Sequence, residues 1–163
     1  MANTTKMRLL KLTALSVMLV SFGFASCHKN QIAKDNHYVG AALPMNGAQE
    51  TPSVSTSASG TIDADYSSLT KTLTYKITWT GLSGPAAAAH IHGTGEAGIA
   101  AAVMQTFSSF PAKTGGTYSN SIIMDGVKFT EEDLLAGRYY ANIHTAAKPN
   151  GEIRGQIILT REQ

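Results

Sequence analysis

The side chains best suited to chemistry in this sequence are two histidines separated by one residue, His90 and His92. Residues two positions apart on a β-strand point to the same side, so both imidazoles would share one face while Ile91 faces the other. Asn142 and His144 repeat this spacing farther along the chain. If the two segments form neighbouring strands, three imidazoles converge, and neutral imidazoles suit copper, zinc and nickel.

Two interpretations of these histidines are open. In the first, His90, His92 and His144 hold a copper or zinc ion, because three protein ligands suffice for a catalytic metal site with one open position. Glu152 or a water molecule would be a further ligand. In the second, the imidazoles hydrogen-bond to loop backbone, and Asn142 and Glu152 order the turns. The sequence favours the second interpretation, since no further aspartate has the spacing expected for a second metal.

Arg154 also has two interpretations. Its guanidinium is suited to clamping an anion or a carboxylate. The alternative, which the sequence favours, is an exposed cross-strand pair with a neighbour such as Glu50, worth about 0.2–1 kcal/mol. No Gly-x-Ser-x-Gly elbow, phosphate loop or dinucleotide fingerprint occurs in the chain. We therefore expect no catalytic residues.

Alternation of apolar and polar residues predicts the strands that must position these side chains. Apolar residues occupy every second position of Thr72–Thr80, and a similar pattern over residues 60–66 predicts a hairpin. A second hairpin is predicted from residues 139–145 and 152–159, with its turn at Asn150-Gly151, because both residues tolerate positive φ. The face of this last strand that we expect to be exposed carries Glu152, Arg154 and Gln156.

Further strands are expected over residues 38–43, 88–92, 101–107 and 118–124. One short helix is expected over residues 131–136, capped by Thr130 and ended by Gly137. Many short strands with one helical turn predict an all-β fold, an antiparallel Greek-key-like β-sandwich of superoxide-dismutase or immunoglobulin-like architecture. A His-x-His strand on such a sandwich is similar to copper-zinc superoxide dismutase, although likeness of architecture does not imply function.

The N-terminal region has the features of an export signal. Lys6, Arg8 and Lys11 precede a short apolar run, and residues 24–27 read Phe-Ala-Ser-Cys. These four residues resemble the bacterial lipobox, which implies a signal peptide over residues 1–26 and lipidation of Cys27. The alternative is a plain signal peptide with an incidental cysteine. Residues 27–37 are expected to be a lipidated tether and residues 38–163 the domain.

Composition excludes several classes of protein. The single cysteine excludes an intrachain disulfide framework. Loss of the signal peptide would remove three of the 13 basic residues and none of the 11 acidic ones, which leaves a net charge of −1. A protein with this net charge is not expected to bind nucleic acid.

Four segments in order resemble the CHRD domain, the module repeated in chordin and found singly in bacterial secreted proteins. They are LPMNGAQETP (43–52), GLSGP leading into AHIHG (81–93), DLLAG followed by YYANIHT (133–145) and PNGEIRGQ (149–156). The resemblance covers residues 39–159 and implies an all-β extracellular module with no settled activity in bacteria.

Together these features predict a non-catalytic extracytoplasmic binding or structural module, anchored to the cell envelope as a periplasmic or surface-exposed lipoprotein. Its expected partners are the membrane, through the lipid, and a protein or glycan at the cell surface. The alternative is a copper- or zinc-binding protein that uses His90, His92 and His144, with redox activity of the superoxide-dismutase type as one form of it.

Overall fold

The computed structural model describes residues 34–163. The predicted signal peptide, Cys27 and most of the predicted tether therefore lie outside the described residues. The end of that tether is part of the fold, because Asp35 accepts hydrogen bonds from the Ser67 hydroxyl and the Leu69 backbone N–H. The first strand begins at His37, one residue before the expected start of the domain.

The described residues form nine strands, one α-helix and one 3₁₀ turn. In chain order these are β1 (His37–Asn46), the 3₁₀ turn η1 (Gly47–Gln49), β2 (Ser59–Ser67), β3 (Thr72–Thr80), β4 (Ala86–His92), β5 (Val103–Thr106), β6 (Gly116–Ile123), α1 (Glu131–Leu135), β7 (Tyr140–Thr145), β8 (Lys148–Gln156) and β9 (Thr160–Arg161). The predicted strands overlap β1 to β8 with shifts of a few residues at their ends.

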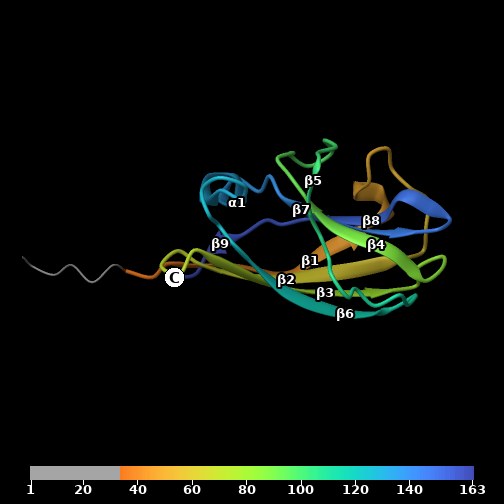
Figure 1. Ribbon diagram of the computed structural model, residues 1–163, viewed down its shortest axis with the longest axis horizontal. Coiled ribbons are helices and arrows are strands. Elements are labelled where there is room, and N and C mark those ends of the chain that lie inside the picture. The colour runs from red at the N-terminus through yellow and green to blue at the C-terminus, as the bar shows by residue number, and fades with distance from the viewer. Residues whose placement is uncertain (1–33) are drawn as a thin grey trace, which may run out of the picture. The chain divides into compact units, whose positions relative to one another are not determined.

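All of these strands belong to one antiparallel sheet, in the order β5-β4-β7-β8-β1-β2-β3-β6, with β9 beside β1. The sheet curls so that β1, β2, β3 and β6 form one layer and β4, β7 and β8 lie over it (Figure 1). β1 joins the layers, because it pairs with β2 along its length and with β8 only where Asn46 faces Arg154. This arrangement confirms the predicted all-β antiparallel fold.

The core lies between the layers and is made by the alternating apolar residues of both predicted hairpins and of β4. Ile62 and Ile77 come from β2 and β3, and Ile91, Ile143 and Ile153 come from β4, β7 and β8; each is at most 1 % exposed. Burial of one such side chain contributes about 1.5–3 kcal/mol to the free energy of unfolding. The same alternation sends the neighbouring histidines to the outer face.

The short helix forms as its sequence predicts. Thr130 is the N-cap, and its hydroxyl accepts a hydrogen bond from the Asp133 backbone N–H at 3.1 Å. Gly137 follows the helix with a φ of +69°, a conformation that favours glycine.

The predicted position of the second hairpin turn is wrong. Thr145 pairs directly with Lys148, so the chain turns at residues 146–147, and Asn150 and Gly151 lie inside β8. Gly151 does adopt a positive φ of +121°, and a Cβ there would clash with Glu50 Oε1. The glycine thus allows the Glu50 carboxyl to approach the strand, and it does not form the hairpin turn.

The prediction of an exposed outer face on β8 is also wrong. Glu152, Arg154 and Gln156 are only 0 %, 1 % and 7 % exposed. Two loops, residues 47–58 and 93–102, cover this face: Thr56 of the first hydrogen-bonds to Glu152, and carbonyls of the second accept from Arg154 and Gln156. The outer side of the β4-β7-β8 layer is therefore a second, polar interior.

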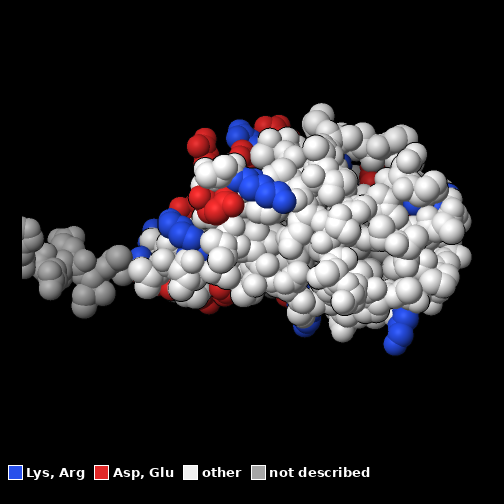
Figure 2. All heavy atoms as spheres, in the orientation of Figure 1, with Lys and Arg blue, Asp and Glu red and all other residues white. Residues whose placement is uncertain are grey.

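Most exposed charge lies elsewhere. Figure 2 shows charged side chains gathered at the end of the domain that carries α1 and β9, while most of the remaining visible surface is uncharged. Ion pairs near α1 join Lys71 to Glu131 and Arg138 to Asp133. Exposed pairs of this kind contribute about 0–1 kcal/mol, so stability depends mainly on the two interiors.

Candidate metal centre

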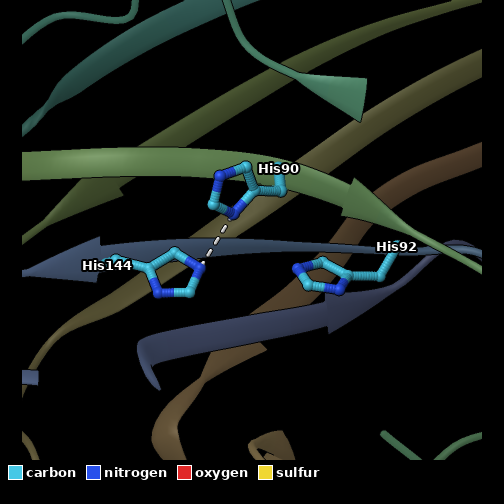
Figure 3. A group of neighbouring side chains, drawn as sticks. All are labelled: His90, His92 and His144. Atoms are coloured by element: carbon cyan, nitrogen blue, oxygen red, sulfur yellow. Dashed lines mark hydrogen bonds between the residues drawn. The ribbon is translucent and has the colours of Figure 1, made fainter. Parts of the chain in front are cut away.

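The pairing of β4 with β7 brings the three predicted histidines together. His90 faces Asn142 in the register, and Ala88 faces His144, so His90, His92 and His144 lie on the same outer face of the two strands. One nitrogen from each imidazole lies within 4.8 Å of the others, and Figure 3 shows the rings around a common space. The nearest pair is His90 Nδ1 and His144 Nε2, at 3.0 Å.

Backbone carbonyls determine which nitrogen carries the hydrogen on two of the rings. His92 Nδ1 lies 2.9 Å from the Ala101 carbonyl oxygen, and His144 Nδ1 lies 2.9 Å from that of Pro149. A carbonyl only accepts, so each Nδ1 donates, and in a neutral ring the Nε2 atom then has a free lone pair. Metal-bound histidines are oriented in this same way by a hydrogen bond from the second ring nitrogen.

Burial keeps two of these rings in the neutral form that binds metals. It lowers the pKa of His90, and the nearby His144 and His92 lower it further. Burial also lowers the pKa of His144, although the Pro149 carbonyl acts in the opposite direction. Both rings are therefore neutral at pH 7, and each has one nitrogen with a lone pair that can bind a cation in place of its hydrogen bond.

An aromatic ring stacks on one face of the His92 imidazole. The Tyr140 ring is parallel to the His92 imidazole, with centroids 4.7 Å apart, and Arg154 Cζ lies 3.4 Å from the Tyr140 centroid. Tyr140 was missed in the sequence, although it precedes Asn142 and His144 at the same two-residue spacing. Extending the alternating pattern by two residues toward the N-terminus would have identified it.

Arg154 fixes the loop that contacts the site. Its guanidinium donates to the carbonyls of Ile99 at 3.0 Å and Glu96 at 3.3 Å, and to Gln156 Oε1 at 2.9 Å. The predicted exposed pair with Glu50 is wrong, because Arg154 is buried and no ion pair joins the two within the described residues. Arg154 instead holds in place the loop that supplies the Ala101 carbonyl.

Glu152 lies outside the histidine cluster. Its carboxylate accepts four hydrogen bonds, from the Ser83 backbone N–H and from the hydroxyls of Ser83, Thr56 and Thr145, at 2.7–2.9 Å. Burial raises the pKa of Glu152, but these bonds outweigh it, so the pKa lies below its usual value. The carboxylate is ionised and committed to these donors.

Glu50 is a second buried carboxyl, and it lies on the other side of Asn142. Burial raises its pKa to about 7, against the opposing effects of Arg154 and of the Asn142 amide. Its Oε1 atom has no hydrogen-bond partner among the described residues. Of the two buried carboxyls, Glu50 is therefore the one that is harder to keep ionised.

Comparison with known proteins assigns a family. No curated protein and no solved structure matches the chain significantly. Within residues 34–163, no helix is long and apolar enough to span a membrane. The family model of the CHRD domain matches residues 42–157, a range that includes every residue of the histidine cluster. This match confirms the resemblance seen in the sequence and indicates an extracellular-type binding or structural module. The chain belongs to the CHRD domain family.

Proposed function

We propose that this protein is a non-catalytic extracytoplasmic binding module, held at the cell envelope through a lipidated Cys27, and that its CHRD domain binds a copper or zinc ion. The ligands are His90, His92 and His144. The family match supports an extracellular-type module. The lipobox-like sequence around Cys27 supports the anchor.

The observation that carries the metal proposal is the orientation of the imidazoles. His92 and His144 each use Nδ1 for a backbone carbonyl and direct Nε2 toward the other members of the cluster. A purely structural cluster would be expected to place a hydrogen-bond donor against each of these lone pairs. His90 Nδ1 lies 3.0 Å from His144 Nε2 and can donate to it, whereas the partner of His92 Nε2 is the Asn142 oxygen, an acceptor. Three imidazole nitrogens in one space match the donor preference of divalent copper and zinc.

Metal binding is tested on the purified, chelator-stripped protein. We expect about one Cu(II) or Zn(II) ion per chain by equilibrium dialysis and elemental analysis. The double variant His90→Ala/His92→Ala should lose at least tenfold in affinity. The matched control is His37→Ala, because His37 is at the start of β1 beside Asp35 and Asp65 and is not part of the histidine cluster. Equal uptake by the double variant would rule out the site.

The structural interpretation of the histidines makes a different prediction. If the imidazoles served only to join β4, β7 and the loops, the double variant would melt at a clearly lower temperature in metal-free buffer and the wild type would gain no stability from metal. We expect instead that Zn(II) raises the melting temperature of the wild type and of His37→Ala, but not that of the double variant.

The anchor is tested by the substitution Cys27→Ser, because serine cannot form the thioether to the lipid. We expect wild-type protein in the membrane fraction and the variant in the soluble extracytoplasmic fraction. Mass spectrometry of the wild type should find a lipid-modified Cys27 at the mature N-terminus. Unchanged fractionation of the variant would contradict this part of the proposal.

A further inference from the structure

Asn142 occupies the centre of the histidine cluster. It is 2 % exposed, and its Oδ1 atom lies 3.0 Å from His92 Nε2 and 2.9 Å from His144 Nε2. Both nitrogens are acceptors, because their rings donate through Nδ1 to backbone carbonyls, and His144 Nε2 also lies 3.0 Å from His90 Nδ1. An amide oxygen is also an acceptor, so three acceptors meet without a hydrogen between them.

Turning the amide over removes this conflict only where the Glu50 carboxyl is protonated, because an ionised carboxylate cannot donate to the amide oxygen. It would place the Asn142 nitrogen against the imidazoles, but it would direct the oxygen toward the Glu50 carboxyl. Glu50 Oε1 is already buried without a donor. The structure places the amide oxygen, and not the amide nitrogen, 3.0 Å from His92 Nε2 and 2.9 Å from His144 Nε2. The oxygen therefore faces the imidazoles.

A cation at the point where the three acceptors meet would satisfy all of them. We propose that Asn142 Oδ1 is the fourth ligand of the metal ion held by His90, His92 and His144; this inference rests on the proposed function. Bonds of about 2.0–2.1 Å in a tetrahedral site give ligand separations of about 3.3 Å. The three shortest separations here are 2.9, 3.0 and 3.0 Å, and the imidazole nitrogens lie within 4.8 Å of one another. An ion would therefore push the close pairs apart and draw the most distant nitrogens together by up to about 1.5 Å.

The fourth ligand determines what kind of ion the site holds and what the site does. Three imidazoles with one amide oxygen and no sulfur favour a divalent ion, Cu(II) or Zn(II), over Cu(I). A site closed by four protein ligands lacks the open position that a catalytic metal needs. The site binds its ion without activating a substrate.

The first test compares substitutions of Asn142. Asn142→Ala removes the oxygen and should weaken Zn(II) and Cu(II) binding at least tenfold, whereas Asn142→Asp retains an oxygen ligand and should bind within a few-fold of wild type. Asn120→Ala, on β6, is the control and should bind as wild type does. Wild-type affinity in a folded Asn142→Ala variant would overturn the inference, and so would loss of binding in a folded Asn142→Asp variant.

A second measurement needs no variant. In the Cu(II)-loaded wild type, a closed site should show no broadening of the electron paramagnetic resonance lines in ¹⁷O-enriched water. Broadening would show a bound water in place of Asn142 and would overturn the fourth-ligand assignment while leaving the three-histidine site intact. Failure of the wild type to bind either ion would instead reject the proposed function itself.

Discussion

Replacement of Glu152 by glutamine tests whether the outer face of β8 is a true interior. The carboxylate is fully buried and accepts four hydrogen bonds from Ser83, Thr56 and Thr145. A hydrogen bond to a charged group contributes about 1.5–3 kcal/mol and a neutral one about 0.5–1.5. Four weakened bonds, partly recovered by rotation of the hydroxyls, predict that Glu152→Gln lowers the free energy of unfolding by about 2–4 kcal/mol.

The assay is urea unfolding in chelator-containing buffer from pH 3 to pH 7. The pKa of Glu152 is lowered in the fold, so its contribution is present above the ordinary glutamate pKa and is lost as the pH falls through the folded value. The difference between wild type and variant should therefore shrink in acid. A variant within 0.5 kcal/mol of wild type at pH 7 would refute the reasoning. The folded variant should still bind metal, because Glu152 is not a ligand.

Three further predictions concern the same interior and its neighbours. The pKa of Glu50 is raised from 4.5 to about 7, so apo wild type should lose about 1–2 kcal/mol of stability between pH 5 and pH 8, after allowance for solvent screening, and Glu50→Gln should not. Arg154→Lys should lower the free energy of unfolding by about 2–4 kcal/mol, because lysine cannot stack on Tyr140 and reach the loop carbonyls at once. Thr130→Ala removes the cap of α1 and should cost about 0.5–2 kcal/mol by thermal or urea unfolding.

The sequence predicts the parts of this fold that depend on neighbours along the chain. Strict alternation in Thr72–Thr80 identifies both the strand and its buried face. The His-x-His and Asn-x-His spacings likewise predict that four polar side chains leave the core on the same side. Their convergence also depends on the pairing of β4 with β7. In the sequence 47 residues lie between His92 and Tyr140, but the two residues face each other in the register. No local pattern encodes that pairing.

The errors come from contacts between distant segments. Alternation alone marks Arg154 and Glu152 as exposed, because a polar residue opposite an apolar one on a strand normally faces water. Here residues 47–58 and 93–102 cover them. The Asn150-Gly151 pair misleads for a related reason: the positive φ of Gly151 serves the approach of the Glu50 carboxyl, a contact across about a hundred residues.

The buried polar side chains have a common consequence for the site. Burial of ionic groups is costly compared with an apolar interior of the same volume, so stability alone does not account for it. Arg154 holds the loop that supplies the Ala101 carbonyl, and Glu152 ties the beginning of β8, near the Pro149 carbonyl, to the neighbouring segments. These two carbonyls are the groups that orient His92 and His144. The polar interior therefore orients the lone pairs of the proposed metal centre before any ion arrives, which would reduce the reorganisation that binding requires.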